Sequence, residues 1–432
     1  NTTARLKKIA SRVVVSQLRR RVKKLLAEHT LTIITVTGTI GKTSAKMAIG
    51  GLLTELGHKV GYSEDSYNTE VGVPLALFGL KIPDRLSSPN AWRNLLKDID
   101  QKMRDYPYDV VVVEIAEDER AMMTPWVELL KPNISVVTAA SAAHMERFES
   151  VEQLRDDAVH LASYGRQIYY NADFEMVREV MERRQHSIGY GVKHGAFRFE
   201  KIARTKEGHL DAELIIGKER KVVRTQLIAE HSLYALLLAA CVAHDLGEPL
   251  AKIAQYLSLI PPMKGRLRLL PGVNDSKLLD DTYNSSPTAV MAAIDTLKQI
   301  PGRSHIAVLG SMNELGRFSP DLHRQVARYA VQSELDMLVT IGKEAAEYLA
   351  TEAIEQGMEK SRVKQFRTPY EAGHYLKKHI LADDVVLVKG SQNGVFAEET
   401  SRILLAPGHH PSHELVRQTP AWKRKKKKSF GI

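Results

Sequence analysis

The chain alternates short, continuous apolar runs with longer segments of helical periodicity, and this alternation limits its fold more than any other feature. Strands that are apolar on both faces are typical of a parallel sheet with helices on both sides. Residues 31 to about 170 are therefore predicted to form a doubly wound α/β sheet, with helices at 43–56 and from about 150. The predicted strands are "LTIITVTG" (31–38), "DVVVVEIA" (109–116), "ISVVTAAS" (134–141) and "QIYYNAD" (167–173).

The same rhythm stops and then restarts. Residues 190–228 favour short β segments, and the next 30 residues favour two helices. The segment "LIPPMKGRLRLLPG", 259–272, is rich in proline and glycine and indicates a domain boundary. Alternating strands and helices beyond it predict a second, Rossmann-like α/β domain. We expect a basic amphipathic helix, a central domain, a C-terminal domain and a basic tail, at 1–30, 31–262, 263–420 and 421–432.

Charge is distributed unevenly along the 432 residues, which carry a net charge of +10. Residues 1–24 hold nine Lys or Arg and residues 423–432 hold six, with no acidic residue in either, so residues 25–422 have a net charge of −5. This argues against a nucleic-acid enzyme with a basic groove. The ends suit an anionic surface such as a membrane or RNA, or they are simply solvated. The first helix could equally lie on a membrane or pack on the body.

The single cysteine, Cys241, lies in an apolar run. An intrachain disulfide and Cys-rich metal sites are therefore excluded, and a reducing cytosol is the expected compartment. No apolar run approaches the ~20 residues of a membrane span. These features predict a cytoplasmic protein, with peripheral contact at the inner face of the membrane as an option.

The stretch "TGTIGKTS", 37–44, is predicted to bind the phosphates of a nucleotide. Gly38 and Gly41 allow the turns that point several N–H groups inward, and the following helix adds its N-terminal dipole. Lys42 would meet the β- and γ-phosphates, and the hydroxyl of Thr43 would bind Mg²⁺. The predicted nucleotide-binding residues of this loop are Gly38, Thr39, Ile40, Gly41, Lys42, Thr43 and Ser44.

Together with this loop, several stretches resemble the Mur ligases of peptidoglycan synthesis, and in particular their MurF-type member. They are, in family order, "TGTIGKTS", "NTEVGVPLAL" (68–77), "VVVEIAED" (111–118), "VVTAASAAHMERFES" (136–150), "LLDDTYNSSPTAVMAAIDTL" (278–297), "AVLGSMNELG" (307–316) and "VLVKGSQN" (386–393). Each motif is weak alone, but seven in order are specific. The resemblance covers residues 31–420.

The resemblance implies an ATP-dependent amide ligase that passes through an acyl phosphate. Glu114 and His144 would bind Mg²⁺, with Thr43 as a further ligand. Lys42, Glu114, His144 and Arg266 would be the catalytic residues, with Arg266 directed at the phosphates. Further implied contacts are Asn284 and His323 at the adenine, Tyr283 and Asp281 near the ribose or the amine, Lys389 and Ser391 at the amino substrate, and Asn68 and Thr69 at the other substrate.

Three departures from the family pattern stand out. Most members carry a carbamylated lysine where this chain has Ala158, and the sequence has no lysine between Lys131 and Lys193. Asp156, Asp157 or His160 would then have to serve the second metal. Ser311 stands directly before "MNELG", where the family usually has an aspartate. Only about 30 residues precede the loop, so the usual N-terminal domain that holds the UDP-sugar is expected to be lacking.

The sequence thus predicts a ligase that uses ATP and Mg²⁺ to add D-Ala-D-Ala to a UDP-MurNAc-peptide. It is expected to be a monomer with small-molecule substrates and no nucleic-acid partner. Two alternatives stay open. The same machinery could act on another carboxylate, such as a cofactor precursor or polyglutamate. The chain could also be a degenerate nucleotide-binding scaffold, as Ala158 and Ser311 would allow.

Overall fold

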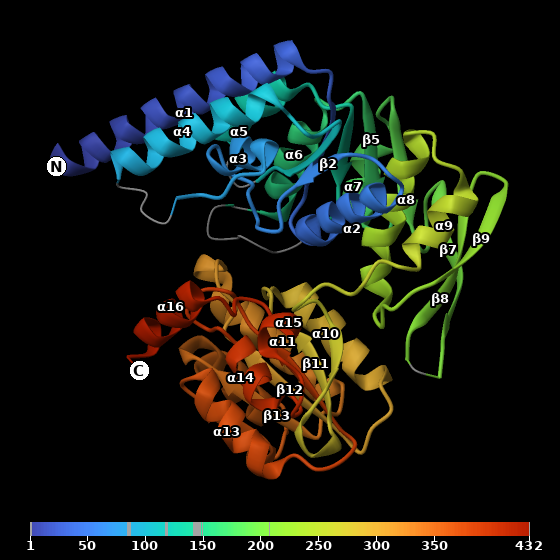
Figure 1. Cartoon of the computed structure of the whole chain (residues 1–432). Coiled ribbons are helices and arrows are strands. Elements are labelled where there is room, and N and C mark those ends of the chain that lie inside the picture. The colour runs from blue at the N-terminus through green and yellow to red at the C-terminus, as the bar shows by residue number, and fades with distance from the viewer. Residues whose placement is uncertain are drawn as a thin grey trace.

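The computed structural model describes residues 2–83, 88–116, 120–140, 148, 150–206 and 208–431, and the side chains among them from residue 12 onward. Two sheets, each with helices on both faces, make up the two halves of the molecule (Figure 1). The larger sheet has the order β2-β3-β1-β4-β5-β6-β7-β8-β9, and the smaller has the order β10-β11-β15-β12-β13-β14.

The larger sheet is parallel from β2 to β7 and antiparallel from there to β9. Residues of β3 alternate between two cores, because Val110 and Val112 face one set of helices while Val111 and Val113 face the other. Burial on both faces explains why β3 is a nearly continuous apolar run. The strands are β1 (Thr32–Thr37), β2 (Val60–Tyr62), β3 (Val110–Glu114), β4 (Ile134–Val137), β5 (Gln167–Asn171), β6 (Ser187–Gly191), β7 (Phe197–Arg204), β8 (Leu210–Ile216) and β9 (Glu219–Arg224).

The smaller sheet is parallel except for its edge strand β10. Its central strand β15 is buried throughout, with Val385 and Leu387 in one core and Val386 and Val388 in the other. The strands are β10 (Arg268–Pro271), β11 (Lys277–Asp281), β12 (Ser304–Gly310), β13 (Met337–Ile341), β14 (Val363–Phe366) and β15 (Asp384–Lys389).

Helices cover both faces of each sheet. In the first half α2, α8 and α9 lie on one face, and α1, α3, α4 and α5 on the other. The helices of this half are α1 (Thr2–Glu28), α2 (Lys42–Glu55), α3 (Gly72–Phe78), α4 (Pro89–Arg104), α5 (Arg120–Leu130), α6 (Val151–Ala162), α7 (Glu175–Met181), α8 (Leu233–Asp245) and α9 (Leu250–Leu257). Those of the second half are α10 (Pro287–Gln299), α11 (Ser319–Gln332), α12 (Thr351–Glu355), α13 (Pro369–His379), α14 (Glu398–Leu404), α15 (Pro411–Glu414) and α16 (Pro420–Phe430).

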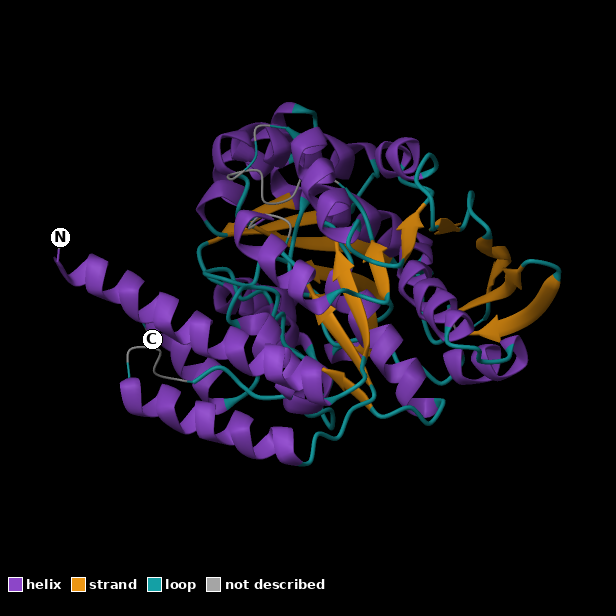
Figure 2. Cartoon of the chain, turned by 90° about the horizontal axis from the view of Figure 1, so that it is seen from above, coloured by secondary structure: helices purple, strands orange, loops and turns teal. Residues whose placement is uncertain are grey.

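The N-terminal helix α1 packs beside α4 (Figure 1). Leu18, Val22 and Leu25 are fully buried in this contact, and Arg21 forms a bidentate ion pair with Asp100 at 2.7 and 2.8 Å. The described part of α1 therefore buries its apolar face against the rest of the protein. Its N-terminal turns extend past the rest of the protein (Figure 2). In the described part of the chain, no helix combines the length and apolar character needed to cross a membrane.

The predicted α/β class with two doubly wound sheets is confirmed. The change of sheet occurs between α9 and β10, within the interval where the sequence indicates a domain boundary. Residues 421–432 were expected to be a basic tail, but most of them form the helix α16, in which Lys426 is fully buried.

Candidate active site

The turn between β1 and α2 has the backbone of a phosphate cradle. Gly38 has φ 115° and Gly41 has φ 88°, in the left-handed region that favours glycine. A Cβ on Gly38 would lie 2.4 Å from the hydroxyl oxygen of Thr138 and 2.8 Å from the carbonyl oxygen of Ala139. The turn is therefore pressed against the end of β4, and its shape requires glycine.

The two functional side chains that directly follow this turn, Lys42 and Thr43, are buried beside it. Lys42 donates from its Nζ to the carbonyl oxygen of Gly38, which holds the ammonium group over the turn. The hydroxyl of Thr43 lies 3.2 Å from the hydroxyl of Ser66. The positive end of α2 and the Lys42 ammonium make this turn an electropositive site suited to phosphate.

Glu114 ends β3 next to Val36 of β1, so it lies at the same edge of the sheet as the phosphate cradle. Its carboxylate is 1% exposed and lies 2.8 Å from the Nζ of Lys46. Lys46 also donates to the carbonyl oxygen of Asp65 at 2.8 Å. The sequence predicted the position of Glu114 but not this lysine, which neutralises it.

The predicted substrate residues Asn68 and Thr69 lie beside the end of β3. The carbonyl oxygen of Asn68 accepts from the N–H of Ala116 at 3.0 Å, and the Thr69 hydroxyl accepts from the N–H of Gly72 at 3.2 Å. The loop is thus fixed next to Glu114.

An open cleft separates the phosphate cradle from the second half of the molecule. It brings together five of the predicted residues, Thr39, Ile40, Gly41, Arg266 and Asn284, and adds Ser285, Ser286, Ala289, Asn313, Glu314 and Leu315. In this cleft the turn before α2 faces the loops that follow β11 and β12. Open α/β sheets bind ligands at such positions, outside the carboxyl ends of parallel strands.

The two halves are linked across this cleft by Tyr283. Its hydroxyl lies 2.7 Å from the hydroxyl of Ser66, which in turn contacts Thr43. The guanidinium carbon of Arg266 lies 4.3 Å from the centre of the Tyr283 ring, a cation–π contact. Arg266 thus lines the cleft beside Tyr283, and its contact with phosphates stays a prediction.

Three predicted substrate residues form an internal network instead of a binding wall. The Nζ of Lys389 lies 2.7 Å from Asp281 and donates to the carbonyl oxygen of Asn284 at 2.9 Å. Burial lowers the pKa of Lys389, and Asp281 opposes that shift. The Ser391 hydroxyl is 1% exposed and accepts from the N–H of Asn313 at 2.9 Å. These residues hold the loops that line the cleft.

The structure does not bring His323 into the cleft, contrary to its expected place at the adenine. The ring is fully buried in α11, and its Nε2 accepts from the N–H of Met312 at 3.0 Å. Its Nδ1 lies 2.8 Å from the carbonyl oxygen of Ser319. With both nitrogens bonded inside the protein, His323 shapes the loop before Asn313. A histidine at helical spacing does not reveal from sequence alone which way it points.

The predicted metal ligand His144 lies outside the described residues. The substitutes proposed for the absent lysine do not converge. Asp157 forms an ion pair with Arg120 at 2.7 Å, Asp156 pairs with Arg155, and His160 stacks edge-on against Tyr164. Ala158 itself is fully buried. Within the described residues, no group of three His, Cys, Asp or Glu side chains could hold a metal ion.

The described residues fit a nucleotide, and one Mg²⁺ beside it. Arg266 Nε and Ser285 Oγ are buried, line the cleft region and have no hydrogen-bond partner. A buried donor without a partner is uncommon and indicates a missing ligand. Glu114 and the Thr43 hydroxyl supply the oxygen ligands that Mg²⁺ prefers, although Lys46 already balances the Glu114 charge.

Sequence reasoning missed Ser66, Ser285 and Lys46. The signal for Ser285 was present, because it follows Tyr283 and Asn284 in the same motif. Lys46 stands four residues after Lys42 and so lies on the same face of α2. Nothing in the sequence indicates Ser66, whose role arises only when the two halves come together.

Two family models match this chain. The Mur ligase middle domain matches residues 36–243, and the Mur ligase glutamate ligase domain matches residues 265–392. A UDP-N-acetylmuramoyl-tripeptide–D-alanyl-D-alanine ligase of Synechocystis is 27% identical over 380 residues, which cover 87% of this chain and 75% of that protein.

Solved structures with the same fold include two MurF enzymes. MurF from Acinetobacter baumannii superposes with a TM-score of 0.74 at 21% identity, over 90% of this chain and 79% of that one. MurF from Thermotoga maritima, in complex with ADP, superposes with a TM-score of 0.73 at 22% identity, over 90% and 84% of the two chains. With both family models matched in order on the two sheets that form the cleft, the chain belongs to the Mur ligase family.

Proposed function

We propose that this chain is an ATP-dependent ligase of the MurF type, which joins D-Ala-D-Ala to the peptide carboxylate of UDP-MurNAc-tripeptide. The observation that carries the proposal is the cleft between the phosphate cradle and the Arg266–Tyr283 pair. The Synechocystis relative, named for the same ligation, supports the choice of substrates.

ATP would supply the phosphoryl group that activates the substrate carboxylate as an acyl phosphate. The chain's own part is to position and to stabilise charge. Inward N–H groups of residues 38–43 and the Lys42 ammonium would hold the β- and γ-phosphates. Arg266 would face them from the opposite side of the cleft. Charge developing on the transferred phosphoryl oxygens would then meet cations from both halves of the molecule.

Thr43 and Glu114 would hold one Mg²⁺ near the same phosphates. Lys46 would then share Glu114 with the metal, and His144 is proposed as a further ligand. No described carboxylate replaces the absent lysine near Ala158, so we propose that a second metal, where present, is held without it. Asn68 and Thr69, next to Glu114, are placed to contact the acid substrate.

We also propose that the reaction takes place in the cytoplasm, close to the membrane. The helices α1 and α16 carry exposed basic residues, and the two ends of the chain lie toward the same side of the molecule (Figure 1). Cationic helices that project from one side would be drawn to anionic lipid headgroups.

The proposed function is tested by ADP release from the purified chain with Mg²⁺ and ATP. We expect turnover only when UDP-MurNAc-tripeptide and D-Ala-D-Ala are both present. Lys42→Ala should abolish turnover and weaken ATP binding at least tenfold in calorimetry, with an unchanged melting temperature in the absence of nucleotide. Lys46 is not a suitable control because it touches Glu114, so exposed Lys427→Met serves as one.

Different results would redirect or end the proposal. Turnover with folate or another carboxylate plus glutamate, but not with the UDP-linked peptide, would show a Mur-type ligase with another acid. ATP binding without turnover on any acid would indicate a nucleotide-binding scaffold. Undiminished ATP affinity in Lys42→Ala would remove the phosphate cradle from the account.

A further inference from the structure

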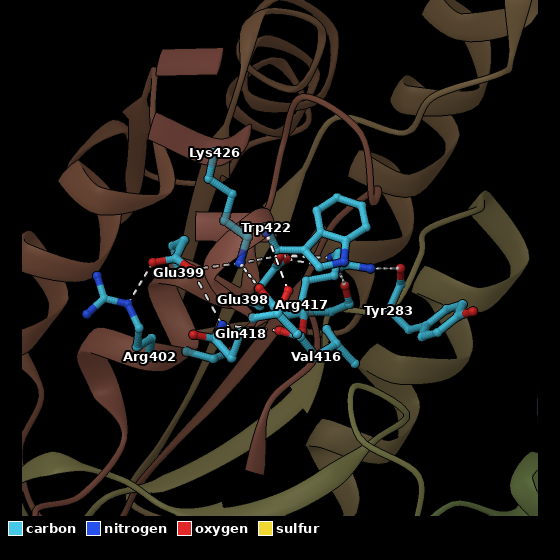
Figure 3. Close-up of polar contacts among 12 residues, drawn as sticks. Tyr283, Glu398, Glu399, Arg402, Val416, Arg417, Gln418, Trp422 and Lys426 are labelled. Carbon is cyan, nitrogen blue, oxygen red and sulfur yellow. Dashed lines mark hydrogen bonds and ion pairs between the residues drawn. The ribbon is translucent and has the colours of Figure 1, made fainter. Parts of the chain in front are cut away.

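The segment 416–430 is anchored to the second half of the molecule by a buried ion network, not by surface charge (Figure 3). Lys426 is fully buried, and its Nζ lies 2.8 Å from an oxygen of Glu398 and 2.7 Å from an oxygen of Glu399. The same Nζ donates to the carbonyl oxygen of Arg417 at 2.8 Å. Its three donors are therefore all satisfied inside the protein.

Arg417 connects this network to the candidate active site. Its Nε and Nη2 donate to the two oxygens of Glu398 at 2.8 and 2.9 Å. Its Nη1 donates to the carbonyl oxygen of Tyr283 at 3.0 Å, and its Nη2 also donates to the carbonyl oxygen of Thr282. The side chain is 7% exposed. One guanidinium thus ties α14 to the backbone that carries Tyr283.

The loop held by Arg417 is the one that lines the cleft from the second half. Tyr283 reaches across to Ser66, and Asn284, Ser285 and Ser286 face the cleft directly. A shift of this loop would move the Tyr283 ring against which Arg266 is placed. Small displacements of positioning groups are costly to catalysis, because reacting atoms must be aligned closely.

The helix α16 contacts the loop after β15 through its aromatic side chains. Trp422 and Phe430 pack against Phe396, with ring centres 6.3 and 6.0 Å apart. Lys425 donates to the side chain of Asn393 at 3.4 Å. The carbonyl oxygen of Asn393 in turn accepts from the side chain of Asn313, which lines the cleft.

We propose that residues 416–430 are part of the ligase site, with Arg417 as a positioning residue that fixes the loop 282–286 through two backbone carbonyls. This inference rests on the proposed function for its effect on turnover, but its effect on the loop and on nucleotide binding does not. Neither Arg417 nor Lys426 needs to touch a substrate. The run of lysines in α16 thus serves as an anchor at one position, Lys426, and is exposed at the neighbouring ones.

The test compares Arg417→Met with Lys427→Met, which removes an exposed charge from α16. Hydrogen exchange measures the loop directly, calorimetry with ADP measures the nucleotide site, and ADP release measures turnover. Arg417→Met should raise exchange in peptides that cover 282–286, weaken ADP binding at least fivefold and lower kcat at least tenfold. Lys427→Met should leave all three within twofold of the wild type.

A second variant separates a loss of positioning from a loss of folding. Arg417→Lys keeps a cation beside Glu398 but cannot donate to both oxygens of Glu398 and both carbonyls at once. It should fold, with a melting temperature nearer the wild type, and still show faster exchange at 282–286. Unchanged exchange and ADP affinity in both Arg417 variants would overturn the inference. A wild type that binds ADP but ligates nothing would overturn the proposed function alone.

Discussion

Three lysines, Lys46, Lys389 and Lys426, have side chains that are at most 2% exposed. Each lies within 2.8 Å of a buried carboxylate, on Glu114, Asp281, or Glu398 and Glu399. Lysine is almost never fully buried unless it is paired, and removing one partner of such a pair leaves an uncompensated charge that costs about 3–5 kcal/mol. All three pairs lie at or near loops of the candidate site, so charge burial here fixes loop positions.

Asp280 is a buried carboxyl without such a partner, and it makes stability depend on pH. Burial raises the pKa of Asp280 to about 6. The folded state holds the proton of Asp280 more tightly than the unfolded chain does. The free energy of unfolding that this proton contributes is therefore full below about pH 4 and is lost as the pH rises through about 6. Asparagine cannot ionise and keeps an oxygen for the hydroxyls of Ser401 and Thr282.

We therefore expect Asp280→Asn to lose less stability than the wild type between about pH 4 and about pH 7. The difference should be on the order of 3 kcal/mol, at about 1.4 kcal/mol per pKa unit. Urea unfolding at several pH values measures it. Exposed Asp321→Asn is the control and should follow the wild type. Parallel stability curves for Asp280→Asn and the wild type would contradict the assignment.

At the scale of elements, the sequence predicts well those strands and helices that are determined by a local pattern of residues. The strands β3, β12 and β15 contain continuous apolar runs because helices cover both their faces, and the run alone predicts a buried strand. The helix α16 is the opposite case. Six successive basic residues are typical of a solvated tail, and the acids that bury Lys426 lie 27 and 28 residues earlier.

The residues of the candidate site also fall into two groups, those placed by local sequence pattern and those placed by the packing of distant loops. The phosphate cradle and Glu114 follow from strand ends and glycine spacing, which are local. The places of His323, Lys389 and Ser391 depend on which loop packs against which, and the resemblance alone put them at substrates. Their bonds to Met312, Asp281 and Asn313 show that they hold loops of the protein in place.

The glycines Gly38, before α2, and Gly57, after it, offer a matched pair for a test. Gly38 and Gly57 both have positive φ, but a Cβ would collide with Thr138 and Ala139 only at Gly38, and would meet nothing within 4 Å at Gly57. Gly57→Ala should cost about 1 kcal/mol, from the backbone alone. Gly38→Ala should cost about 2 kcal/mol more and abolish ADP binding. Chemical unfolding and calorimetry measure both, and equal losses would refute the cradle's packing.

At the scale of the whole molecule, the two halves meet through Ser66 and Tyr283 at the cleft, through a hydrogen bond from Arg204 to Gln299, and where Ile228 and Ala229 enter the core of the second half. The basic segments that contain no acidic residue lie elsewhere, on α1 and α16. Exposed ones include Arg12, Arg20 and Lys23 on α1 and Lys423 and Lys428 on α16. The mildly acidic body and the cationic side of the molecule give it an uneven field, which would orient it at an anionic surface.

Co-sedimentation with vesicles tests this orientation. We expect binding to vesicles that contain about one-third anionic lipid, little binding to neutral vesicles, and release as salt rises, since charge attraction is screened within ~10 Å at 0.1 M salt. A variant with Lys423, Lys427 and Lys428 changed to glutamine should bind less and keep its turnover. Equal binding to neutral and anionic vesicles would contradict the proposal.

The anchoring of α16 bears on when the site becomes complete during synthesis. A chain is made from its N-terminus, and domains generally fold as they emerge from the ribosome. Every strand of both sheets precedes residue 390, whereas the guanidinium that fastens the loop beside the cleft comes at 417 and its lysine anchor at 426. A nascent chain could therefore fold both sheets while this fastening is still inside the exit tunnel, and its cleft loop would be fixed only after residue 426 has emerged.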